Sequence, residues 1–205
     1  MSMPALLSHF GINRARFVTQ SGRIVFDGVS RTSSNGYSHS EHGTVTPVNP
    51  HTFHGGVDEP DDAEKKAPDW WNEGPAINRH KKAMSESFPQ FVFYSADNGR
   101  GPFWVGDIDT GRGRFTIGVI LRREGGLPSV LVLKGGQLGA RAGRRWIKSP
   151  HLYTSGNICV ADQSDWDPER DTVATVTAWA AHWLAAYTEW RFARNWPVEG
   201  FAMPA

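Results

Sequence analysis

The sequence predicts an α+β fold, and two observations carry this prediction. Two segments with helical spacing of apolar residues, 76–88 and 171–191, lie on either side of four short apolar runs. Gly-rich breaks separate these runs, and such short connections fit antiparallel strands because parallel strands need long crossovers. The expected order is therefore an N-terminal helix, a four-stranded antiparallel meander, a long loop and a C-terminal helix.

The limits of each element follow from local signals. The first helix places Ile77, Met84 and Phe88 on one face, and Pro89 ends it. In the second helix, Asp171 or Thr172 can cap the start of a segment whose apolar residues recur every three or four positions. The strands between them are expected at 91–94, 103–108, 115–121 and 130–133.

The composition of the chain changes near residue 67. Residues 30–66 are rich in Ser, Gly, Asn, Pro and acidic residues, so we expect them to bury too little to offset their ordering entropy. Upstream, a short hairpin is expected at 16–26. The predicted organisation is thus a largely flexible N-terminal extension, 1–66, and a compact domain, 67–205.

Charge and hydropathy exclude several classes of partner. The net charge of +1 predicts no nucleic-acid partner. No apolar run approaches the roughly 18 residues that span a bilayer, so no membrane association is expected. The start of the chain lacks the pattern of a secretory signal, and a lone cysteine fits a reducing compartment. These features predict a cytoplasmic protein.

Cys159 is the only cysteine among 205 residues. It cannot form an intramolecular disulfide, which leaves a buried spectator, a redox thiol or a nucleophile. Gly156 permits a tight turn nearby, and the polar residues on both sides favour the nucleophile. That role requires the sulfur to be reachable from solvent.

No metal or cofactor is expected. The pairs His39 and His42, and His51 and His54, have a spacing seen among metal ligands. Both pairs lie in the polar segment and no thiolate accompanies them, so chance is the better explanation.

The cysteine loop, residues 149–160, resembles the active-site loop of the ubiquitin-conjugating enzyme (UBC) family. The matching positions, including two just beyond the loop, are His151, Gly156, Ile158, Cys159, Val160, Trp166 and Pro168. Leu152-Tyr153 replaces the family's Pro-Asn, which removes the asparagine that stabilises the oxyanion. This departure and the Trp-rich C-terminal helix look like the prokaryotic branch, which occurs in antiphage operons. The resemblance implies a UBC-like fold over about 68–205.

The resemblance also implies roles for individual residues. Cys159 would carry a thioester, and His151 would brace the loop rather than act as a base. Tyr153 and Asn157 are the candidates for the lost oxyanion donor, with backbone N–H groups as the alternative. Asp162 and Asp165 would orient or deprotonate an incoming amine, although solvated loop carboxylates would look the same.

In this family the first helix docks the activating enzyme. The basic face formed by Arg79, His80, Lys81 and Lys82 is therefore a candidate partner-binding surface, with an ordinary solvated face as the alternative.

The function that the resemblance implies is acyl transfer in bacterial antiviral defence. The expected partners are an activating enzyme, a target protein, and a donor that is either a ubiquitin-like modifier or the C-terminus of a CBASS nucleotidyltransferase. One alternative is a non-catalytic UBC-like binding module. Another is a cysteine hydrolase with His182 or His80 as its base.

Overall fold

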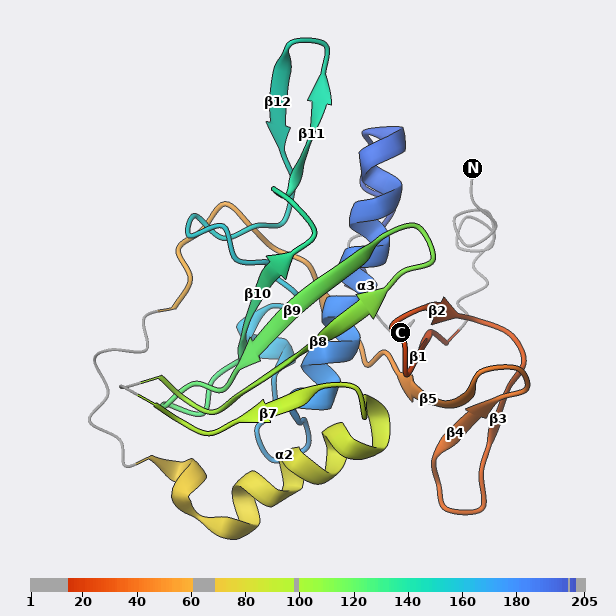
Figure 1. The fold of residues 1–205 in the computed structure, drawn as a ribbon, viewed down its shortest axis with the longest axis vertical. Coiled ribbons are helices and arrows are strands. Elements are labelled where there is room, and N and C mark those ends of the chain that lie inside the picture. The colour runs from red at the N-terminus through yellow and green to blue at the C-terminus, as the bar shows by residue number, and fades with distance from the viewer. Residues whose placement is uncertain (1–14, 61–68, 98–99, 199, 202–205) are drawn as a thin grey trace.

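A computed structural model describes residues 15–60, 69–97, 100–198 and 200–201 (Figure 1). Its two α-helices and antiparallel sheets confirm the α+β class. One expectation is wrong: the first of these helices does not lead the fold, because six strands precede it.

The N-terminal part forms a five-stranded sheet in the order β2-β1-β5-β4-β3. Its strands are β1 (Phe17–Thr19), β2 (Ile24–Val25), β3 (Val29–Arg31), β4 (Tyr37–His39) and β5 (Gly43–Pro47). Next, β6 (His51–Thr52) pairs with β13 (Gly200–Phe201). This differs from the expectation of little regular structure in 30–66, of which residues 61–66 lie outside the described part of the chain. The strands are too short to show periodicity, and a few buried anchors, Val18, Val45 and Val48, hold them to the protein.

The remaining elements form the body that carries the cysteine loop. A 3-10 turn, η1 (Trp70–Asn72), leads into α2 (Gly74–Ser87). A four-stranded antiparallel sheet follows, with β7 (Val92–Tyr94), β8 (Phe103–Asp109), β9 (Arg114–Ile120) and β10 (Ser129–Lys134) side by side in that order. The last elements are β11 (Gly139–Ala142), β12 (Arg145–Lys148), η2 (Gln163–Asp165) and α3 (Val173–Ala193).

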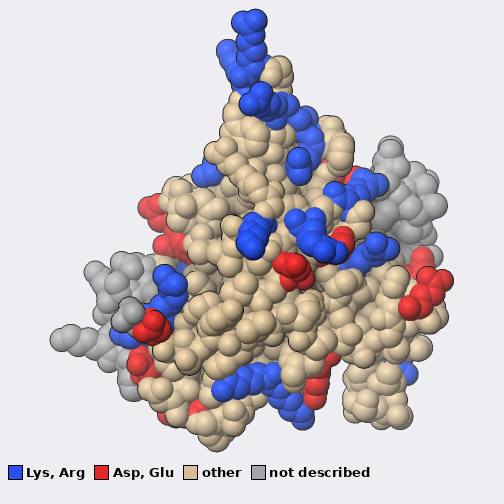
Figure 2. Space-filling view, in the orientation of Figure 1, with Lys and Arg blue, Asp and Glu red and all other residues tan. Residues whose placement is uncertain are grey.

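The β11–β12 hairpin was not expected from the sequence. Figure 1 shows it projecting beyond the sheet, and Figure 2 shows the basic side chains gathered on it.

Helix α3 is the central element of the core. It contacts β9 of the four-stranded sheet, β1, β2 and β5 of the N-terminal sheet, and α2. Being covered on these sides, it is apolar around most of its circumference. Two of its fully buried tryptophans donate hydrogen bonds outward: Trp179 Nε1 to Asn49 O (3.0 Å) and Trp183 Nε1 to His151 O (3.1 Å). The helix therefore fixes both the N-terminal segment and the cysteine loop.

In the described part of the chain, no helix combines the length and the apolar character that crossing a membrane requires.

Candidate active site

The cysteine loop is held by backbone hydrogen bonds to its neighbours. Ile158 N donates to Val130 O of β10 (3.2 Å), and Cys159 N donates to His151 O (3.1 Å). A tight turn at Gly156, where φ is +93°, closes with Gly156 N donating to Tyr153 O (2.9 Å). The loop thus folds back on itself beside the edge strand β10, and Cys159 lies in its returning limb.

Cys159 is only 1% exposed, so the expected solvent-reachable sulfur is not what the structure has. Sγ lies 3.7 Å from Ala161 O. Burial raises the pKa of the thiol above its usual value, against the lowering effect of hydrogen bonds with the Tyr153 side chain and the His54 backbone. The thiol borders a pocket of about 270 Å³.

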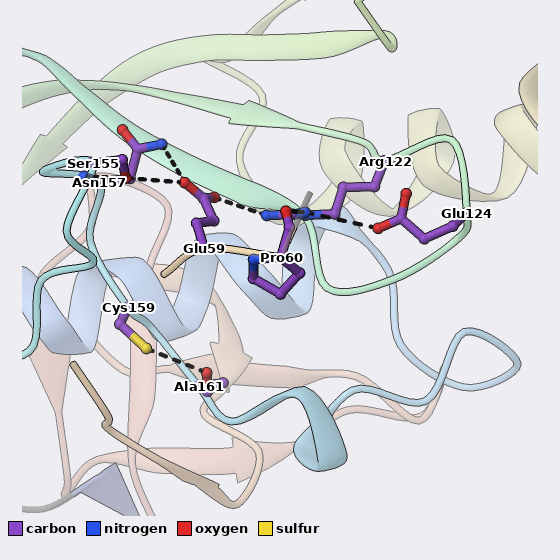
Figure 3. A network of polar contacts seen from close by, with 8 residues as sticks. All are labelled: Glu59, Pro60, Arg122, Glu124, Ser155, Asn157, Cys159 and Ala161. Carbon is purple, nitrogen blue, oxygen red and sulfur yellow. Dashed lines mark hydrogen bonds and ion pairs between the residues drawn. The ribbon is translucent and has the colours of Figure 1, made fainter. Parts of the chain in front are cut away.

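The cover over this pocket is an N-terminal segment, residues 54–60, which we call the strap. His54, Gly55, Val57, Asp58 and Pro60 line one wall of the pocket, facing Tyr153 and Asp162. Figure 3 shows the strap residues Glu59 and Pro60 between the cysteine loop and Arg122. The strap therefore covers the pocket side of Cys159, whereas its neighbours Ile158 and Val160 pack into the core.

Tyr153 and Asn157 occupy different surroundings. Tyr153 is buried, and burial followed by its hydrogen bond with Cys159 raises the pKa of its hydroxyl. It therefore stays protonated and is placed beside the sulfur. Asn157 Nδ2 instead donates to Glu59 Oε2 (2.6 Å), so its amide is engaged by the strap.

His151 has the geometry of a brace. It adopts a left-handed backbone conformation (φ +55°), and its Nδ1 lies 3.0 Å from His54 O. Because a carbonyl oxygen only accepts, the ring nitrogen is the donor. The ring packs against Trp196, with centroids 4.8 Å apart.

Asp162 and Asp165 form a capping box around η2. Asp162 borders the pocket, its Oδ2 lies 3.3 Å from His54 Nε2, and hydrogen bonds from Ser164 lower the pKa of its carboxyl. Asp165 Oδ2 accepts from Thr52 N (2.7 Å) and Asp162 N (3.1 Å). The structure thus brings Asp162 to the pocket, whereas Asp165 holds the frame together.

The four basic residues predicted as one surface divide into two pairs. Arg79 donates to the backbone carbonyls of Pro168, Glu169 and Asp171. His80 is buried, and its Nδ1 accepts from Val173 N (3.1 Å) at the start of α3. Only Lys81 and Lys82 are exposed, so only they remain as a partner surface.

Two residues of the site were missed by sequence reasoning, namely Glu59 and Arg122. Glu59 Oε1 lies 2.9 Å from Arg122 Nη2, and both side chains are largely buried. No local pattern could reveal this pair, because the partners are 63 positions apart.

Among the described residues, no group of three or more His, Cys, Asp or Glu side chains is placed to hold a metal ion. The His39 and His42 rings stack on each other. His51 pairs with His182 at 3.1 Å. His182, one of the bases considered for a hydrolase, thus lies in a buried histidine pair and not among the residues bordering the Cys159 pocket.

Comparison with known proteins adds one finding. No curated protein and no solved structure matches the chain. The family model described as Type II CBASS E2 protein matches residues 80–203, more than half of the sequence, including the cysteine loop. A match of this extent indicates an E2-like conjugation role in antiviral defence. Because the model covers more than half of the sequence, the chain belongs to the Type II CBASS E2 family.

Proposed function

We propose that the protein is a conjugating acyltransferase that carries its donor as a thioester on Cys159. The observation that carries this proposal is the position of the thiol: it borders a pocket together with the protonated Tyr153 hydroxyl and the Asp162 carboxylate, on the loop that the family match includes. The family match over 80–203 supports a UBC-like domain in that part of the chain.

The loading step exchanges one thioester for another. The Cys159 thiolate attacks the donor's carbonyl carbon, held as a thioester on an E1-like activating enzyme. A new C–S bond forms and the old one breaks. The departing thiolate takes up a proton, which balances the proton that Cys159 gave up.

The transfer step passes the acyl group to a target. A neutral amine attacks the same carbon, a C–N bond forms, and Cys159 leaves as thiolate and regains a proton. Asp162 can accept the proton that the amine loses. The Tyr153 hydroxyl is the side-chain donor for the oxyanion, and one such donor contributes about 3 kcal/mol to lowering the barrier.

The family match favours a CBASS setting over a ubiquitin-like operon, so the proposed donor is the C-terminus of a CBASS nucleotidyltransferase. Lys81 and Lys82, exposed on α2, are the proposed contact for the activating enzyme in the cytoplasm.

The test is formation of the adduct. The protein is incubated with activating enzyme, ATP and donor, and the products are separated without reducing agent. The proposal expects a thiol-sensitive adduct on the wild type, a thiol-resistant ester on Cys159→Ser and none on Cys159→Ala. An adduct that survives on Cys159→Ala contradicts it.

A second candidate function, a non-catalytic binding module, is favoured by the 1% exposure of Cys159. It predicts that Cys159→Ala leaves phage protection intact. The first candidate predicts that protection is lost.

A further inference from the structure

The strap lies along the cysteine loop and bends at Gly56, where φ is +74°. Gly56 N donates to Leu152 O (2.9 Å), and Thr154 N donates to Val57 O (3.1 Å). His151 Nδ1 donates to His54 O (3.0 Å). Two of these bonds join backbone to backbone and the third comes from the His151 ring, so the loop holds the strap mainly through its main chain. In peptide recognition, such main-chain bonds supply affinity and side-chain pockets supply specificity.

A glycine is required where the strap passes closest to the loop. A Cβ at residue 55 would lie 2.6 Å from His151 Cα and 2.9 Å from Leu152 N. These are backbone atoms of a loop that is held by the hydrogen bond from Trp183 Nε1 to His151 O, so they have little room to move. The surface therefore accepts a residue without a side chain at this register.

An acidic residue, Glu59, makes the polar contacts of the strap four positions further along. Arg122 is buried, with its side chain 5% exposed, and it donates to Glu59 Oε1 and to Pro60 O. Glu59 Oε2 accepts from Ser155 Oγ (3.2 Å) and Asn157 Nδ2 (2.6 Å). Figure 3 shows the carboxylate between these groups. Arg122 Nη1 also lies 3.7 Å from Glu124 Oε1, so removing the Glu59 carboxylate would leave a buried guanidinium with one carboxylate in place of two, which is costly.

The strap is also the element that covers the thiol. The His54 backbone hydrogen-bonds with Cys159, and five strap residues wall its pocket. A donor tail that reaches Sγ would therefore have to share this pocket with the strap or displace it.

We propose that the surface beneath the strap is a binding site for an acidic peptide that follows the same bent path, with glycine beside His151 and a carboxylate on Arg122, and that the strap is its built-in competitor. The inference rests on the proposed function in one respect, that the competing peptide is the tail of the acyl donor. When the strap occupies this site, it blocks access to the Cys159 thiol. When the donor tail occupies the site instead, the thiol is open to the acyl group at the end of that tail.

The first experiment measures how fast iodoacetamide alkylates Cys159 in the folded protein. Gly55→Ala is expected to accelerate alkylation by about tenfold or more, because the added methyl lifts the strap. Glu59→Gln, which removes the charge but keeps the shape, is expected to act in the same direction. The control is Gly74→Ala at the start of α2, where an added Cβ meets nothing within 4 Å.

The second experiment supplies the strap as a separate molecule. A synthetic peptide of residues 54–60 is titrated into the Gly55→Ala protein, and binding is measured by isothermal calorimetry and by renewed protection of Cys159. The peptide with the strap sequence is expected to bind. Versions that carry Gly55→Ala or Glu59→Gln are expected to bind at least about tenfold more weakly.

Two outcomes overturn the proposal. One is a Gly55→Ala protein with an unchanged melting temperature and an unchanged alkylation rate. The other is equal binding of all three peptides, which would show that the surface does not select for glycine at position 55 or for the negative charge at position 59. Neither readout needs acyl transfer, so a protein that passes both tests yet forms no thioester would refute the proposed function and leave the binding site standing.

Discussion

His182 Nδ1 lies 3.1 Å from His51 Nε2, and both rings are buried between α3 and the segment that leads into the strap. Two protonated rings could not occupy this space together. Burial lowers the pKa of His51 to about 4, and burial with the neighbouring His51 lowers the pKa of His182 well below its usual value. The contact therefore requires neutral imidazoles.

A loss of stability in mild acid follows from this arrangement. Burial lowers the pKa of His80 to about 4 as well. These histidines bind protons more readily in the unfolded chain than in the folded protein. Their contribution to the free energy of unfolding is therefore at its full value above about pH 6.5 and decreases as the pH drops towards 4. Each histidine contributes a slope of about 1.4 kcal/mol per pH unit in that window.

The contribution of His80 can be isolated with His80→Asn, whose amide oxygen can accept from Val173 N as the ring nitrogen does. Urea unfolding between pH 7 and pH 4.5 should show a slope smaller by about one proton in this variant. An identical slope in wild type and variant would contradict the assignment of a buried neutral His80.

The anchoring of the cysteine loop by α3 can be tested with Trp183→Phe. This change keeps an aromatic ring but removes the donor to His151 O and leaves a void at a fully buried position, so more than about 1 kcal/mol of stability should be lost. Trp146→Phe on the exposed β11–β12 hairpin is the matched control, and it should change the unfolding free energy little. Equal effects of the two substitutions would argue against a special role of Trp183.

Tyr153→Phe tests the polar partner of the thiol. The tyrosine hydroxyl lowers the thiol pKa by hydrogen bonding, so its removal should raise that pKa further and move the pH profile of Cys159 alkylation to higher pH. Tyr37→Phe, on the remote strand β4, should leave the profile in place. A shift to lower pH in Tyr153→Phe would reverse the assigned effect.

The division of the basic residues on α2 predicts two distinct phenotypes. Arg79→Met removes donors to three carbonyls that precede α3 and should cost about 2 kcal/mol of stability. Lys81→Glu with Lys82→Glu removes only surface contacts with the Phe93 ring and Glu86, so it should change the melting temperature little but weaken loading by the activating enzyme. Loading that is unaffected by the double substitution would show that Lys81 and Lys82 do not contact the activating enzyme.

Much of the body of the fold could be predicted from the sequence, because its elements are long enough for periodicity to be read. Apolar spacing and capping residues predict a helix over 171–191, which agrees with the observed α3 to within two residues at each end. The apolar runs that became β8 and β9 were placed within one residue. The cysteine was singled out because it is alone and lies in a polar, glycine-containing loop.

The N-terminal sheet and the strap could not be predicted, and the reason is physical. Strands of two to five residues carry too little pattern, and their stability comes from anchors such as Val18 and Val45 docking on distant elements. The contacts of Glu59 with Asn157 and Arg122 join positions 98 and 63 residues apart. The buried thiol was missed for the same reason, since what covers it comes from this segment.

The intact mass of the protein after incubation with activating enzyme, ATP and donor shows whether Cys159 carries the acyl group. We expect a gain equal to the donor minus one water, reversed by hydroxylamine, faster in Gly55→Ala than in wild type and absent in Cys159→Ala. A protein that gains no mass in either the wild-type or the Gly55→Ala form, or that gains it equally without Cys159, would contradict the claim that this thiol carries the acyl group.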